Sequence, residues 1–230
     1  MTTRRFLGGL RAATATAGLC VALLGCSSQP PVPDWQMTAH GAAQKAVEAY
    51  LSGNSRVEKL EFERARAETA RTGQPALLAR IELLRCAARV ASLVMGPCEG
   101  FEALREDAAA PEKAYAHYLA GRIDASEVPL LPPAQQGVAA SAPGSAAAAL
   151  QAVADPLSRL VAAGVLLQTG RADPAVVALA TDTASAQGWR RPLLAWLLLQ
   201  AQRAEAAGDT QASAQLQRRI AVVERSGATP

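Results

Sequence analysis

Glycines and Asp-Pro pairs divide this alanine-rich chain into short segments of helical length. Asp155-Pro156 and Asp173-Pro174 each place a helix-capping aspartate before a proline that suits the first helical turn. Gly170, Gly188 and Gly208 follow such segments, as glycine does at helix ends. Alanine is the strongest helix former, and turns this short leave neighbouring helices antiparallel. We therefore predict an all-α fold of antiparallel helical hairpins, arranged as a solenoid or a bundle.

Apolar residues at helical spacing predict the individual helices. The expected ranges are 38–52, 55–72, about 75–94, 111–121, 157–169, 175–187, 192–207 and 209–225. Ser55 and Glu58 have the spacing of a capping box for the second helix. The segment 75–94 is apolar almost all round, so we expect neighbouring helices to bury most of its surface. Its four charged side chains argue against a membrane span.

Prolines and glycines concentrate in residues 122–145, and this composition predicts an irregular segment. It would separate an N-terminal helical half, 36–121, from a C-terminal helical half, 146–228. Two interpretations stay open at this stage. The segment is either a boundary between two small domains or a long loop packed across a single domain.

The first 25 residues have the pattern of an export signal. Arg4, Arg5 and Arg11 precede Ala12–Gly25, a run of 14 residues without charge. A basic start, an apolar middle and a small residue at the end are typical of a secretory signal peptide. The run is shorter than the roughly 20 residues that a membrane-spanning helix needs. We therefore predict that residues 1–25 are a signal peptide.

The run ends in Leu23-Leu24-Gly25-Cys26, which resembles the lipobox of bacterial lipoproteins. The resemblance implies that Cys26 is diacylated on sulfur and becomes the first residue after cleavage. Ser27, where an aspartate would favour the inner membrane, implies the periplasmic face of the outer membrane. Residues 26–35 would then be the lipidated cysteine and a proline-rich tether, reaching on the order of 25 Å. The alternative is an ordinary signal peptide that leaves Cys26 as a thiol.

Removing the signal peptide changes the charge balance. The 23 basic and 20 acidic residues of the chain become 20 of each, because three arginines leave. A net charge of zero gives no electrostatic case for nucleic acid as a partner. Cys86 and Cys98 remain, and in an oxidising compartment we predict that they form a disulfide. Two separate buried thiols are the alternative.

Little in the sequence suggests chemistry. His40 and His117 lie in no metal-ligand spacing, and no catalytic motif is present. We therefore expect no metal, no cofactor and no enzymatic activity. Four aromatic residues are candidates for a binding groove, although filling an aromatic-poor core explains them better: Tyr115, Tyr118, Trp189 and Trp196.

Two further resemblances bear on function. Gly170–Asp173 and Gly208-Asp209 lie 38 residues apart, a spacing similar to tetratricopeptide-type hairpins, although that family's landmark residues do not align. The chain also resembles uncharacterised alanine-rich outer-membrane lipoproteins of proteobacteria. Stacked hairpins offer surfaces for protein partners, so we expect a membrane-anchored, periplasm-facing scaffold or adaptor with a protein partner in the cell envelope.

Two other functions stay open. One is a periplasmic enzyme or enzyme activator acting on cell wall or a small ligand, and the other is a purely structural lipoprotein. Acids or histidines that converge in a pocket would favour the enzyme. A groove without such convergence would favour the adaptor.

Overall fold

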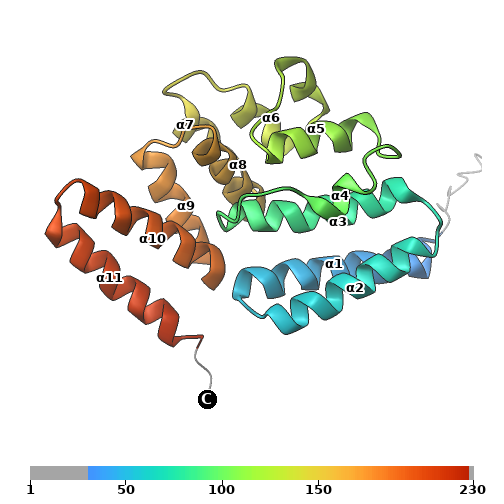
Figure 1. The fold of residues 1–230 in the computed structure, drawn as a ribbon, viewed down its shortest axis with the longest axis horizontal. Helices are drawn as coiled ribbons and strands as arrows, with labels where there is room; N and C mark the ends of the chain where they lie inside the picture. Colours follow the sequence, from blue (N-terminus) through green and yellow to red (C-terminus); the bar gives the residue numbers. More distant parts are fainter. Residues whose placement is uncertain (1–30, 228–230) are drawn as a thin grey trace, which may run out of the picture. The chain divides into compact units, whose positions relative to one another are not determined.

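The computed structural model describes residues 31–227, and every regular element in that range is a helix (Figure 1). The all-α prediction is therefore confirmed for the described residues. Residues from Val32 onward belong to one compact unit. The predicted signal peptide, 1–25, and the lipidation site, Cys26, lie outside the described residues. The elements are α1 (Asp34–Ser52), α2 (Ser55–Ala70), α3 (Pro75–Ala91), α4 (Glu99–Glu102), α5 (Ala110–Leu119), the 3₁₀ helix η1 (Ala125–Leu130), α6 (Pro133–Ala139), α7 (Ala146–Gln151), α8 (Pro156–Gln168), α9 (Pro174–Gln187), α10 (Arg190–Ala206) and α11 (Thr210–Arg225).

Successive long helices pack as hairpins. Figure 1 shows α1 beside α2, in blue, and α10 beside α11, in red. The three expected aspartate caps are present: the carboxylates of Asp155, Asp173 and Asp209 accept backbone N–H groups at 2.7, 2.8 and 2.9 Å. Each bond satisfies a donor that has no partner within its helix. The predicted starts of α8, α9 and α11 are thus confirmed to within a residue or two.

Helices far apart in sequence share one core. α3 lies against α8, and α1 contacts α10. Trp189 Nε1 donates to Glu48 Oε2 at 3.0 Å, and Arg191 Nε donates to the Tyr50 carbonyl oxygen at 2.7 Å. Most buried apolar residues belong to one continuous cluster that includes α3, α5, α8, α9 and α10. The N-terminal and C-terminal helices therefore pack as a single unit.

Residues 122–145, predicted to be irregular, contain η1 and α6. Pro133 opens α6 instead of breaking it, because the first helical positions need no N–H donor. Gln135 and Val138 of α6 are almost completely buried, and α6 contacts α8. The segment is therefore packed across the unit and does not link two separate halves.

Two helix starts differ from the sequence prediction. α1 begins at Asp34, within the predicted tether 26–35, and places that carboxylate in the positively polarised first turn. Asn54, and not Ser55, caps α2: its Oδ1 accepts the Val57 N–H at 3.1 Å. Glu58 is consequently free of any capping role and accepts a hydrogen bond from Arg85 Nε at 3.1 Å.

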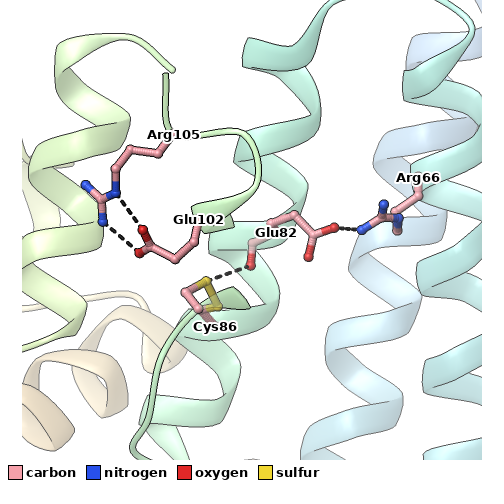
Figure 2. Close-up of a disulfide and its surroundings, with 6 residues drawn as sticks. Arg66, Glu82, Cys86, Glu102 and Arg105 are labelled. Carbon is pink, nitrogen blue, oxygen red and sulfur yellow. Dashed lines mark hydrogen bonds and ion pairs between the residues drawn. A yellow bond between two sulfur atoms is a disulfide. The ribbon is translucent and has the colours of Figure 1, made fainter. Parts of the chain in front are cut away.

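The Cys86–Cys98 disulfide is present, with 5.9 Å between the two Cα atoms, and the prediction is confirmed (Figure 2). It attaches the short helix α4 to α3. A loop of this size stabilises a fold by roughly 3 kcal/mol in the chain-entropy model. Beside it, Glu82 of α3 is buried and forms an ion pair with Arg66 of α2. Covalent and ionic contacts thus hold α2, α3 and α4 together.

Within residues 31–227, none of the helices combines the length and the apolar character required to span a membrane.

Candidate functional site

A large open cavity lies between α1, α3, α5, α8 and the η1–α6 segment. We call it the apolar groove. Its volume is about 1050 Å³, at the upper end of the ~300–1,000 Å³ of ordinary small-molecule pockets. Most of its lining is aliphatic, including Leu77, Leu83, Leu84, Leu131, Leu157 and Val161. A surface of this kind favours an apolar ligand or an apolar segment of a protein partner.

Helix α3 contributes more apolar residues to the wall of the groove than any other helix. Its periodicity places apolar side chains on nearly all sides, but neighbouring helices cover only some of them. Ala79 and Ala88 are buried away from the groove, whereas Leu77, Ile81 and Leu84 are half-buried and line it. The expectation that neighbours bury most of this helix therefore holds for one side only. The other side forms the groove.

One ion pair interrupts the apolar lining. Arg80 Nε donates to Glu112 Oε1 at 2.6 Å. Arg80 is exposed, but only 9% of the Glu112 side chain is accessible to solvent. Oε2 of Glu112 is buried and has no hydrogen-bond partner among residues 31–227. A buried carboxylate oxygen without a partner is costly, and Glu112 is one of the residues that line the groove.

Two other polar side chains of the groove have structural roles. Gln135 accepts the Tyr118 hydroxyl at 2.8 Å and donates to the Ser158 carbonyl oxygen at 3.0 Å. Asp155 caps α8. Gln135 and Asp155 thus hold α5, α6 and α8 in place. His40 also lines the groove and is exposed, and it forms no acid–base pair within the described part of the chain.

Tyr115 and Tyr118 are stacked, with ring centroids 6.2 Å apart. Burial raises the pKa of both phenols above the usual value, with the Asp155 carboxylate adding to the effect at Tyr115. Both side chains are consequently neutral at physiological pH. Tyr115 therefore contributes aromatic surface to the groove, and Tyr118 supports it from the core through its hydrogen bond to Gln135.

The four aromatic residues proposed as a groove do not form one together. Tyr115 lines the apolar groove. Tyr118 and Trp196 are almost completely buried, and Trp189 is 9% exposed. The indole N–H groups of Trp189 and Trp196 each have a partner within the protein. With so few large side chains in the chain, three of the four are used to fill the core, as the alternative interpretation expected.

Sequence reasoning missed Arg80 and Glu112 as site residues. They are 32 positions apart, and each occurs in a segment where a charged residue looks like ordinary helix surface. One signal was present in the sequence: α3 has more apolar side chains than one buried face requires.

No group of three or more His, Cys, Asp or Glu side chains within residues 31–227 is arranged to hold a metal ion. Comparison with protein-family models, with curated proteins and with solved structures finds no match to this chain.

Proposed function

We propose that this chain is a lipid-anchored, periplasm-facing adaptor of the outer membrane that binds a protein partner in the apolar groove. The observation that carries the proposal is the groove itself, about 1050 Å³ and mainly aliphatic. The lipobox-like Leu23–Cys26 supports the anchor and the location. The hairpin packing supports the tetratricopeptide-like character of the domain.

The occupant would be an apolar segment of the partner, because burial of its apolar surface against the apolar walls is favourable. At about 25 cal/mol per Å², a segment that covered the groove would gain several kcal/mol. Grooves between helices commonly accept an amphipathic helix in this way. A donor on that segment, such as a lysine ammonium, would satisfy Glu112 Oε2 and fix the register.

The enzyme alternative requires titratable groups that converge on a ligand. In the groove, Asp155 is used as a helix cap and Glu112 is paired with Arg80. This arrangement supports binding over catalysis. The adaptor is therefore the function that the geometry supports best.

Site-specific photocrosslinking tests the groove. With p-benzoylphenylalanine in place of Leu77 in the full chain, we expect a defined crosslinked partner in intact cells. Adding Glu112→Gln should reduce the crosslinked yield about tenfold, because a hydrogen bond to a charged acceptor contributes roughly 1.5–3 kcal/mol.

Val222 on α11 provides the control position. It is an apolar residue, 59% exposed, and it does not line the groove. The same photoreactive side chain at Val222 should not capture that partner. Equal yields of one species from both positions, or no effect of Glu112→Gln, would contradict the proposed binding mode.

The anchor is tested separately. Cys26→Ala should abolish incorporation of radiolabelled palmitate and leave an unprocessed precursor, because only a lipidated cysteine is cleaved by this route. The double variant Cys86→Ala, Cys98→Ala should keep the label, which separates lipidation from the other cysteines. Label retained in Cys26→Ala would disprove the anchor and leave the groove experiment interpretable.

A further inference from the structure

A second, smaller hollow of about 230 Å³ lies beside the disulfide. We call it the arginine hollow. Three arginines line it: Arg89 in α3, Arg105 after α4 and Arg122 after α5. Glu102 is the one carboxylate residue in its lining. Positive charge is therefore concentrated here, in a chain that is neutral overall once residues 1–25 are excluded.

Arg105 is already occupied. Its Nε and one terminal nitrogen each donate to Glu102 at 2.7 Å, in the two-pronged geometry shown in Figure 2. Its other terminal nitrogen lies 3.4 Å from His117 Nε2, and His117 Nδ1 lies 2.8 Å from a Glu127 carboxylate oxygen. The hydrogen bonds from Arg105 lower the pKa of Glu102. Arg105 and Glu102 thus form a fixed, charge-compensated wall.

Arg89 and Arg122 are not compensated in this way. Both are exposed, and neither takes part in the ion pairs formed within residues 31–227. Each lies near a helix C-terminus, where a cation is favourable, but neither donates to the carbonyl groups there. Both residues line the hollow, and planar guanidinium groups without a partner in the protein are free to donate to a bound anion.

We propose that the arginine hollow binds a phosphate-bearing anion through Arg89 and Arg122. A tetrahedral phosphate offers several oxygens, so two guanidinium groups can bind it at once with charge-assisted hydrogen bonds. The disulfide holds α4 on α3 and limits how far the walls can separate, which lowers the ordering cost of binding. The phosphate belongs either to a soluble phosphate ester or to a phospholipid headgroup.

This site is independent of the apolar groove and of the proposed adaptor function. Arg89 and Arg122 do not line the groove, and anion binding does not require a protein partner. Its failure would leave the groove experiments unaffected.

Calorimetric titration of the full chain in nonionic detergent, at low ionic strength, tests the proposal with sodium phosphate and glycerol 3-phosphate. The variant Arg89→Gln, Arg122→Gln should bind at least tenfold more weakly. The matched control is Arg218→Gln, Arg219→Gln, which removes the same charge from exposed positions of α11 and should bind as the original protein does. Should the double variant unfold, Arg122→Lys keeps the charge, loses the planar fork and should still weaken binding.

Vesicles separate the two sources of phosphate. Cosedimentation with phosphatidylglycerol vesicles, compared with phosphatidylcholine vesicles, is measured for the same variants produced without residues 1–26, so that the proposed anchor on Cys26 cannot carry every variant to both kinds of vesicle. The phosphate would belong to a phospholipid headgroup if the Arg89→Gln, Arg122→Gln variant lost vesicle binding, the control variant kept it, and the original protein did not bind the soluble anions. Binding of soluble anions that depends on these two arginines would assign the ester. Equal behaviour of the test and control variants in both assays would overturn the proposal.

Discussion

Replacing Trp196 with alanine is expected to lower the free energy of unfolding by about 3–5 kcal/mol, the range observed for large aromatic side chains in cores. Trp196 is completely buried in the middle of α10. The chain has 4% aromatic residues, so the alanines around the site cannot refill the space. For a protein of this size, the loss corresponds to a melting temperature lower by on the order of 10 °C.

Trp196 also has a polar role. Its Nε1 donates to the carbonyl oxygen of Ala91, the last residue of α3, at 3.1 Å. The final carbonyl groups of a helix have no partner within the helix. Trp196→Phe keeps most of the ring and removes the donor, so it should leave the Ala91 carbonyl buried without a partner. We expect this change to destabilise the protein by about 1–3 kcal/mol.

Trp189→Phe is the matched control. Trp189 is also largely buried, and its Nε1 donates to Glu48 at 3.0 Å. Glu48 is exposed, so water can replace the lost donor at its carboxylate. The expected cost of the lost bond is below about 1 kcal/mol. Urea unfolding, followed by circular dichroism, measures the stability of Trp196→Phe and Trp189→Phe. Equal losses of unfolding free energy in the two variants would contradict the assignment of Trp196 as a cap for α3.

The contact between Trp196 and Ala91 illustrates what the sequence could not reveal. Helix starts at Asp155, Asp173 and Asp209 were predictable because each depends on a hydrogen bond to a residue three positions away. The partner of Trp196 is 105 positions away. Nothing local distinguishes that tryptophan from Trp35, which lines the apolar groove.

The surroundings of the candidate site likewise combine a feature that the sequence predicted with features that it did not. The disulfide was predictable because the predicted export signal implies an oxidising compartment, in which Cys86 and Cys98 are the two cysteines left to pair. The groove was not, because it is formed where five separate elements leave part of α3 uncovered. Glu112 is ordinary in sequence, in the first turn of α5. Its importance arises from burial and from an oxygen without a partner, and both depend on tertiary packing.

Replacing Gly164 with alanine should destabilise the protein although alanine favours helix. Gly164 lies in α8 where this helix crosses α3. A Cβ atom there would overlap the carbonyl oxygen of Val90 and would lie 2.9 Å from Val90 Cγ1. Backbone cannot move aside as a flexible side chain can, so the two helices must separate. We expect a net loss of about 1–3 kcal/mol from overpacking.

Gly41→Ala should have the opposite effect and stabilise the protein. Gly41 is in the interior of α1, and a Cβ atom there would have no neighbour within 4 Å. Reduced freedom of the unfolded chain should stabilise this variant by about 0.5–1 kcal/mol. The free energies of unfolding of the two variants, measured in urea under the same conditions, distinguish the effect of close packing from that of helix propensity. A stabilising effect of Gly164→Ala would show that α3 and α8 are less tightly packed than the structure indicates.

The same substitution connects stability with the groove. α3 and α8 form two of its walls, through residues such as Leu84 and Val161. Separation of the helices at Gly164 should therefore alter the groove as well as the core. We expect Gly164→Ala to reduce crosslinking from the Leu77 position at temperatures where the variant is still folded, whereas Gly41→Ala should leave it unchanged. The small residue at this crossing thus fixes the spacing on which the proposed binding depends.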